Sequence, residues 1–539
     1  MLGSTHLRAI SPEAKKIGLA AFVSSTAFAA VLGITAPAQA PVESAAPAPA
    51  TTSGDSVELQ LLGVNDLHGR LESPKALRRA AGGPPVGIGG AAALDAHLDR
   101  AERSHPGRTI RVHAGDMVGA SPLLSSYFHD EPTIRATNLM DFDVGTLGNH
   151  EFDEGGDELT RLLRGGQRSD GRQFKRDATG RRTNTSAPDF AGVDFPYIAA
   201  NTVDREERLQ LPPTRVIERA GVKVGFIGVT TTATPNHVLD DYTERFDWLD
   251  ISDTVNRHAA ELRNQGVEAI VVLAHSGAYA DGDSGAAAGE IIDEAREMTG
   301  AVDVVIAGHT HSQLNTRVRN TDGFGDKLVV EAQSYGAAFD RVRIRLDRRS
   351  GQVTAKSADT PTTWNNEVTP DPAVAALVAR YRATLGGLGE RAVGRLAEGL
   401  ERAGSLSDVA ARAQRRMAGA DVAFVEGGNS RGSLSEGMVT YDELFEASSY
   451  EHQVMRMEMT GAGLRRVFEQ QWEAEPDAPL HVAGLDEAAL DDDATYVVAA
   501  NALLMDQDQF TAFREYGRDV QPVGTDLEAL EGWIRSRGA

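Results

Sequence analysis

One layout recurs five times along the chain: a short apolar stretch runs directly into polar residues that can bind a metal ion. Short stretches of apolar and β-branched residues predict buried strands. In open α/β sheets, ligands bind at the carboxyl ends of the strands. The layout therefore predicts an α/β domain with a polar site along one edge. The five stretches are 59–64, 109–113, 144–146, 269–274 and 302–307, followed in turn by Asp66-Leu-His68, Gly115-Asp116, Gly148-Asn-His-Glu151 with Asp153, His275, and Gly308-His-Thr-His311.

Two of these polar segments carry paired side chains at a spacing of two residues, Asp66 with His68 and His309 with His311. On an extended backbone this spacing places both side chains on one side, so each pair is expected to face a common centre. A single pair of this kind is more often a surface pair, but five segments together supply carboxylates, imidazoles and an amide. The chain contains no cysteine, which excludes thiolate ligands. Nitrogen and oxygen donors in this number suit a pair of borderline or hard divalent ions.

The N-terminal region has the layout of a secretory signal peptide. Basic residues precede an Ala-rich apolar stretch over 17–34, and small residues follow as far as Ala40. We expect residues 1–40 to be a signal peptide, cleaved near Ala40 or at Ala45-Ala46, with an N-terminal membrane anchor as the alternative. Residues 41–55, rich in Pro, Ala, Ser and Thr, predict a flexible linker. These features predict an exported protein that is secreted, periplasmic or held at the cell surface.

Length and charge limit the body of the protein. The chain has 539 residues, which is longer than a domain with a single hydrophobic core usually is. Acidic residues outnumber basic ones by 78 − 54 = 24, which disfavours nonspecific binding to a nucleic-acid polymer. We expect a first α/β domain over 56–360, a linker with a connecting helix over 361–390, and a second, smaller α/β domain over 391–539.

The motifs, in their order along the chain, resemble a known family. Gly63-Val-Asn-Asp-Leu-His-Gly69, Gly115-Asp116, Gly148-Asn-His-Glu-Phe-Asp153, Ala274-His-Ser276 and Gly308-His-Thr-His311 are similar to the signature of calcineurin-like metallophosphoesterases. With the segments 420–431, 441–445 and 459–464, the chain resembles more narrowly the secreted bacterial 5′-nucleotidase and UDP-sugar hydrolase family. The resemblance implies a four-layer α/β/β/α metallophosphoesterase domain, followed by a smaller α/β domain of the C-terminal 5′-nucleotidase type that binds the substrate.

The resemblance also implies a centre of two divalent metal ions. It makes Asp66, His68 and His311 the ligands of one ion, Asn149, His275 and His309 the ligands of the other, and Asp116 the bridge between them. Such donors suit Mn²⁺, Zn²⁺, Co²⁺ or Fe²⁺ alike, so the metal is not identified.

The same resemblance makes His150 the catalytic histidine, paired with Asp153. An aspartate partner favours the protonated imidazole, which can stabilise transition-state oxygens or protonate the leaving group. The alternative is that His150 is a further metal ligand or supports one. Of the histidines outside the motifs, His113 is expected to pack inside its strand, and His129, His237 and His258 to be structural or exposed.

The match is looser in the second domain. Arg402 and Arg431 correspond to arginines that hold the substrate phosphate in the family, and Tyr450 and Leu503 fall on its two base-stacking aromatics. The family's glycine-rich loop is shortened here to Gln507-Asp508-Gln509, in which Asp508 is the candidate contact. Glu426 stands where the family commonly has asparagine. Because Leu503 is not aromatic, only one of the two base-stacking rings is expected, that of Tyr450.

These observations predict an exported dinuclear-metal phosphohydrolase that releases phosphate from nucleotides by attack of a metal-bound hydroxide. The expected partner is a small phosphate ester, without a nucleic-acid polymer and without stable membrane insertion after signal cleavage. One alternative keeps the metal centre but takes nucleotide-sugar pyrophosphates, 2′,3′-cyclic nucleotides or non-nucleotide phosphate esters. Another is a surface-binding protein without catalysis.

Overall fold

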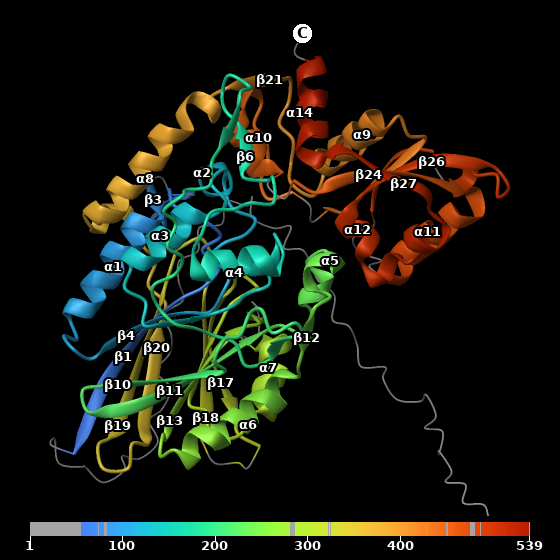
Figure 1. The fold of residues 1–539 in the computed structure, drawn as a ribbon. Helices are drawn as coiled ribbons and strands as arrows, with labels where there is room; N and C mark the ends of the chain where they lie inside the picture. The colour runs from blue at the N-terminus through green and yellow to red at the C-terminus, as the bar shows by residue number, and fades with distance from the viewer. Residues whose placement is uncertain are drawn as a thin grey trace, which may run out of the picture.

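The computed structural model describes residues 55–537, apart from 74, 80–82, 281–285, 322, 324, 428–429, 449–450, 475–479 and 486. The expected signal peptide, nearly all of the expected linker, and Tyr450 lie outside the described residues. Figure 1 shows a large N-terminal α/β part, coloured blue to gold, beside a smaller C-terminal part in orange and red. None of the described helices combines the length and the apolar character needed to span a membrane.

Two six-stranded sheets form the centre of the N-terminal part. In each sheet four strands run parallel and antiparallel strands are added at the edges. The first sheet has the order β20 (Val353–Asp359), β19 (Asp340–Asp347), β1 (Ser56–Val64), β4 (Thr109–His113), β5 (Val144–Thr146) and β8 (Tyr197–Ile198). The second has the order β10 (Thr214–Arg219), β11 (Val222–Thr230), β13 (Ala269–His275), β16 (Val304–Ala307), β18 (Asp326–Ala332) and β17 (Gln313–Arg319).

The central strands are mostly apolar, as is usual for strands with both faces buried, although β4 includes the buried Arg111. Along β1, Leu61 points into the core between the two sheets, whereas Leu62 points into the core beneath the helices. Along β13, Val271 and Val272 divide between two cores in the same way. Helices α1 (Ala91–Arg103), α2 (Leu123–Ser126), α3 (Glu131–Leu139) and α8 (Pro372–Leu385) cover the first sheet, and α6 (Ile251–Asn264) and α7 (Glu290–Glu297) cover the second. This confirms the four-layer α/β/β/α arrangement.

Shorter elements surround this core. The surface insertion near residues 165–190 forms a small hairpin of β6 (Phe174–Arg176) and β7 (Arg182–Asn184). The other elements are β2 (Lys75–Arg78), β3 (Pro85–Ile88), the 3₁₀ turns η1 (His150–Phe152) and η2 (Thr234–Asn236), α4 (Gly156–Arg164), β9 (Thr202–Asp204), α5 (Asp240–Thr243), β12 (Phe246–Trp248), β14 (Tyr279–Ala280) and β15 (Ala287–Ala288).

The C-terminal part is the expected smaller α/β unit. Its five-stranded sheet has the order β25 (His481–Gly484), β22 (Val422–Val425), β26 (Thr495–Asn501), β24 (Gln453–Thr460) and β27 (Arg518–Thr525), and β21 (Ala392–Leu396) pairs with β23 (Gly437–Thr440). Its helices are α9 (Ser405–Ala418), α10 (Tyr441–Ala447), α11 (Gly461–Ala474), α12 (Ala502–Asp506), α13 (Ala512–Tyr516) and α14 (Asp526–Arg537).

The two parts are packed against each other. One apolar cluster continues from Leu94 and Leu98 of α1 through Leu377 of α8 to Leu527 and Trp533 of α14. The connecting helix α8 begins as its sequence predicts, because the Asp371 side chain accepts hydrogen bonds from two backbone N–H groups of the first turn. The connecting helix and the shared core thus hold the C-terminal part beside the carboxyl ends of the central strands.

Candidate functional site

The ends of β1, β4, β5, β13 and β16 bring the seven predicted metal ligands together. Their ligand atoms fall into two neighbouring clusters of His, Asp and Asn side chains. The first cluster holds Asp66, His68 and His311: His68 Nε2 lies 3.1 Å from His311 Nε2 and 3.7 Å from Asp66 Oδ1. His311 Nε2 lies 3.3 Å from the same Asp66 oxygen. This is the first ligand set that the resemblance implied.

The second cluster holds Asn149, His275 and His309. Asn149 Oδ1 lies 3.1 Å from His275 Nε2 and 3.0 Å from His309 Nδ1. Asp116 lies between the clusters, because its Oδ2 atom is 3.1 Å from His275 Nε2 and 3.6 Å from His68 Nε2. A carboxylate in this place can contact two cations at once and offset their mutual repulsion.

Hydrogen bonds outside the clusters determine which ring nitrogen faces inward. His68 Nδ1 donates to the Gly119 carbonyl at 2.9 Å, and His275 Nδ1 donates to the Ala114 carbonyl at 2.8 Å. In the neutral imidazole, Nε2 then carries a lone pair directed at carboxylate and amide oxygens. Acceptor atoms that converge in this way fit a bound cation, and backbone carbonyls on the outer nitrogens are usual for metal-binding histidines.

The pKa values point to the same need for positive charge. Burial, followed by the positive charge of Arg431, lowers the pKa of His68 to about 3, which keeps its ring neutral. Burial opposes the charged form of His275, but Asp116 outweighs it and raises the pKa of His275 to about 10. The buried carboxylates therefore stabilise a positive charge beside them, and divalent cations would supply it.

The backbone at these ligands differs from the sequence prediction. Asp66, His68, His309 and His311 have φ angles of 51°, 49°, 79° and 56°, so the prediction of extended backbone is wrong. Strands β1 and β16 end before these residues, and the chain turns through the left-handed region, which Asp and His adopt more readily than most residues. His309 lies in the second cluster and His311 in the first.

The predicted catalytic pair lies beside both clusters. His150 Nδ1 is 2.8 Å from Asp153 Oδ2, and the His150 ring centroid is 4.9 Å from that of His68. Burial opposes the charge on His150, but Asp153 and Asp116 outweigh it and raise its pKa above the ordinary value. His150, His68 and Asp116 are also close enough to share an ion, which keeps the ligand interpretation of His150 as the alternative.

Glu151 is a buried residue of the site to which sequence reasoning gave no role. Its carboxylate accepts hydrogen bonds from the backbone N–H groups of Asp116 and Met117, both at 2.9 Å, and from that of Gly148. Burial, with Asp116, raises the pKa of Glu151 to about 7. Glu151 thus ties together the loops that carry Asp116 and Asn149.

We expect Glu151→Gln to weaken divalent-metal binding by roughly 10- to 100-fold, since loss of a group that orients metal ligands commonly has that effect. Glutamine keeps the size of the side chain but offers one acceptor oxygen in place of two. Calorimetric titration with Mn²⁺ measures the change. Glu218→Gln, on the exposed side of β10, is the matched control. Equal affinities in the two variants would show that Glu151 does not support the metal site.

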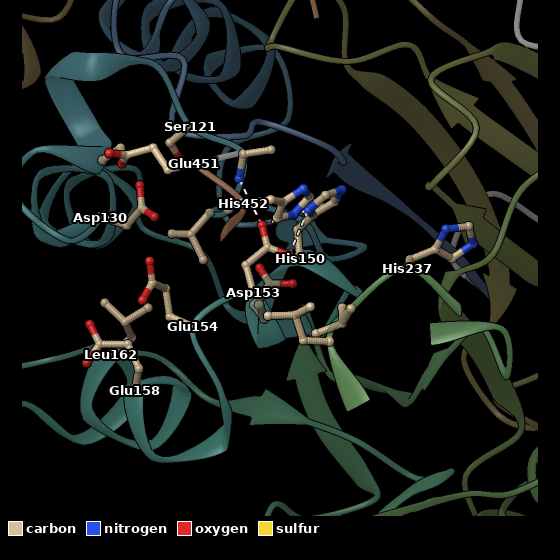
Figure 2. A pocket seen from close by; sticks show the side chains of 17 residues that line it. Ser121, Asp130, His150, Asp153, Glu154, Glu158, Leu162, His237, Glu451 and His452 are labelled. Atoms are coloured by element: carbon tan, nitrogen blue, oxygen red, sulfur yellow. Dashed lines mark hydrogen bonds and ion pairs between the residues drawn. The ribbon is translucent and has the colours of Figure 1, made fainter. Parts of the chain in front are cut away.

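A pocket of about 80 Å³ opens next to the catalytic pair. Figure 2 shows His150 and Asp153 in the middle of its lining, His237 on one side, and Asp130, Glu154 and Glu158 on the other. His237 also packs against His309, with ring centroids 5.3 Å apart. His237, predicted to be structural or exposed, is half-buried beside the site, a place that depends on the tertiary fold and that no local motif marks.

The other three histidines pack as predicted. His113 is fully buried among Phe142, Phe195 and Tyr197. His129 is buried and bonded to a threonine, and His258 pairs with a glutamate on its own helix.

Of the predicted substrate residues, the structure brings Arg431 to the site. Arg431 Nη1 donates to the Tyr335 hydroxyl at 3.5 Å, and burial, followed by the charge of Arg431, lowers the pKa of His68. Sequence reasoning also missed Tyr335, which lies beside His311 and His68, and the neighbouring Arg70, because these residues come near the ligands only through the tertiary fold.

Three of the other predicted substrate residues, Arg402, Leu503 and Asp508, lie in described parts of the second domain. The backbone N–H of Arg402 donates to Ser433 Oγ at 3.0 Å. Arg402 is exposed before α9, Leu503 is half-buried on α12, and Asp508 is exposed and paired with Arg514 at 3.2 Å. Glu426 accepts a hydrogen bond from Gln507 Nε2 at 3.2 Å, so the two departures from the family pattern contact each other.

Comparison with known proteins extends this description. Residues 59–313 match the family described as calcineurin-like phosphoesterase, and residues 389–487 match the 5′-nucleotidase, C-terminal domain. The chain is 30% identical over 520 residues to Endonuclease YhcR of Bacillus subtilis, and the matched region covers 90% of this chain and 40% of that protein. It is 32% identical over 582 residues to Cell wall protein Lmo0130 of Listeria monocytogenes, covering 94% of this chain and 70% of that protein.

Among solved structures, the fold resembles the 5′-nucleotidase precursor from Thermus thermophilus, with a TM-score of 0.70 and 22% identity, covering 89% of this chain and 97% of that one. The chain thus spans less than half the length of the B. subtilis relative but nearly the whole of this structural neighbour. The family matches confirm the resemblance, and with it the four-layer fold. The chain belongs to the calcineurin-like phosphoesterases that carry a 5′-nucleotidase C-terminal domain.

Proposed function

We propose that this protein is an exported hydrolase with two metal ions that releases phosphate from nucleotides. The observation that carries the proposal is the pair of ligand clusters that share Asp116, with His150 and Arg431 beside them. The signal-like N-terminus and the similarity to a protein named as a cell wall protein support export.

In this proposal Asp66, His68 and His311 would hold one ion and Asn149, His275 and His309 the other, with Asp116 available to both. When bound, two divalent ions polarise the phosphoryl group and lower the pKa of an attacking water. The clusters contain only nitrogen and oxygen donors, so Mn²⁺, Zn²⁺, Co²⁺ and Fe²⁺ all remain suitable.

The protein's own side chains supply the rest of the chemistry. Protonated His150, held by Asp153 at 2.8 Å, donates its Nε2 proton to the leaving oxygen or stabilises charge on it. Arg431 offers a forked set of donors to the phosphate oxygens. Because the chain carries 24 more acidic than basic residues, these local positive groups are what allow an anionic substrate to bind.

The family domain at residues 389–487 favours a nucleotide as substrate. A second candidate is a phosphate diester such as a 2′,3′-cyclic nucleotide. Two observations favour it: Leu503 cannot stack on a base as an aromatic ring does, and the B. subtilis relative is named an endonuclease.

A hydrolysis panel decides between the two candidates. With Mn²⁺ added, we expect release of inorganic phosphate from AMP with a kcat/KM at least about tenfold above that of p-nitrophenyl phosphate, because the second domain contributes binding that a small ester lacks. Hydrolysis of 2′,3′-cyclic AMP and UDP-glucose tests the alternatives and is followed by chromatography of the nucleotide products, because cleavage of either compound leaves its phosphate groups esterified. Inert AMP together with turnover of the cyclic, sugar-linked or small ester would contradict the nucleotide proposal while leaving the metal centre intact.

A further inference from the structure

We propose that Tyr335 is a positioning residue, which connects the metal-ligand cluster to Arg431 and holds that arginine at the phosphate site. The inference rests on the proposed function, because it assumes that Arg431 binds the phosphate of the substrate. Tyr335 follows β18, and its ring centroid lies 5.4 Å from that of His311 and 5.9 Å from that of His68. It therefore borders the first ligand cluster directly.

The phenol of Tyr335 contacts the second domain. Arg431 Nη1 donates to the Tyr335 hydroxyl at 3.5 Å. Arg431 belongs to the segment between β22 and β23, and its backbone N–H donates to the Ala447 carbonyl at the end of α10. The hydroxyl of Tyr335, in the first domain, thus contacts the guanidinium of Arg431, in the second domain.

The ring of Tyr335 is held from its face. The guanidinium carbon of Arg70 lies 4.6 Å from the ring centroid, within the range of a cation–π contact. Arg70 Nη1 also lies 2.5 Å from Glu446 Oε2 on α10, and the Arg70 side chain is only 8% exposed. A chain of contacts therefore begins at Glu446 in the second domain and continues to Arg70 and Tyr335 in the first. It ends at Arg431, which again belongs to the second domain.

The backbone of Tyr335 is tied to a metal ligand. Its N–H donates to the Asp66 carbonyl at 2.7 Å, and its φ angle is 64°. The left-handed region is uncommon for a bulky residue and persists only where the surroundings hold it. One residue thus supports the left-handed turn at Asp66 through its main chain and contacts Arg431 through its side chain.

The test is the affinity of the Mn²⁺-loaded protein for inorganic phosphate, measured by calorimetry. Tyr335→Phe keeps the ring and its contacts with Arg70 but removes the hydroxyl. We expect about three- to tenfold weaker phosphate binding, the usual effect of one hydrogen bond. In an Arg431→Gln background, Tyr335→Phe is expected to change the affinity no further, because Tyr335 acts through Arg431. A purely structural role would lower affinity equally in both backgrounds.

Tyr242→Phe is a matched control, since it removes a tyrosine hydroxyl bonded to Arg172 on the protein surface. We expect it to bind phosphate like the wild type. Unchanged affinity in Tyr335→Phe, losses that multiply in the double variant, or a wild-type protein that binds no phosphate would each overturn the proposal. The nucleotide proposal fails separately, through inert AMP, because phosphate binding does not require AMP turnover.

Discussion

Asp116→Asn is expected to lower phosphate release by about a thousandfold or more. The Oδ2 atom of Asp116 lies 3.1 Å from His275 Nε2 and 3.6 Å from His68 Nε2, so this side chain is the shared member of the two clusters. Asparagine keeps the shape and removes the charge. Metal ions contribute several kcal/mol of transition-state stabilisation, and about 1.4 kcal/mol corresponds to each factor of ten in rate. Losing the second ion therefore accounts for the size of the effect.

Two measurements accompany this variant. The rate is followed as released phosphate, and the metal content per chain is determined by mass spectrometry, where we expect fewer than two ions to be retained. Asp194→Asn, at an exposed position, is the matched control and is expected to behave like the wild type. Equal rates for Asp116→Asn and wild type would remove the catalytic role of the clusters and favour a surface-binding protein.

His150→Ala has the second largest expected effect, a fall in kcat of about 10²- to 10⁴-fold with both metals retained. His150 Nδ1 is held by Asp153, and its pKa is raised because the nearby carboxylates outweigh burial. The ring is therefore available as a proton donor, and removing it eliminates that step without removing a ligand from either proposed set.

A matched control exists on α6, where His258 Nδ1 lies 2.8 Å from Glu261 Oε2, again a histidine and an acid three residues apart. His258→Ala removes the same kind of pair away from the metal clusters and is expected to leave kcat unchanged. Metal content separates the two interpretations of His150. Loss of metal together with activity in His150→Ala would show that His150 is a ligand.

The α/β strands with polar residues at their ends could be predicted from local patterns, whereas the four-layer arrangement and the two ligand sets were implied by the resemblance to the family. The sequence of a strand such as β13 is a continuous series of apolar residues, because neighbours such as Val271 and Val272 are buried on opposite faces of the sheet. The carboxyl ends of the parallel strands lie along one edge of the sheet, so the residues that follow the strands meet at that edge. Because this rule needs no knowledge of distant contacts, the positions of Asp116 and His275 could be inferred before the fold was known.

The parts that the sequence did not predict depend on backbone turns and on the meeting of distant segments. The left-handed φ angle of Asp66 occurs just after β1 ends. The alternation of side chains along an extended strand says nothing about the backbone beyond the end of the strand. Glu151 acts through backbone N–H groups, so its role has no spacing pattern. Tyr335 borders the first ligand cluster from within the first domain, but its contact with Arg431 and the contact of Arg70 with Glu446 form only where the second domain packs against the first.

The most direct test of the central claim is a metal titration of the chelator-treated protein, with phosphate release from AMP recorded after each addition of Mn²⁺. If Asp116 joins two ions, activity is absent without metal, rises with added metal, and levels off at two equivalents per chain. Full activity in protein shown by mass spectrometry to be free of divalent metal, or a plateau at one equivalent, would contradict the two-metal account.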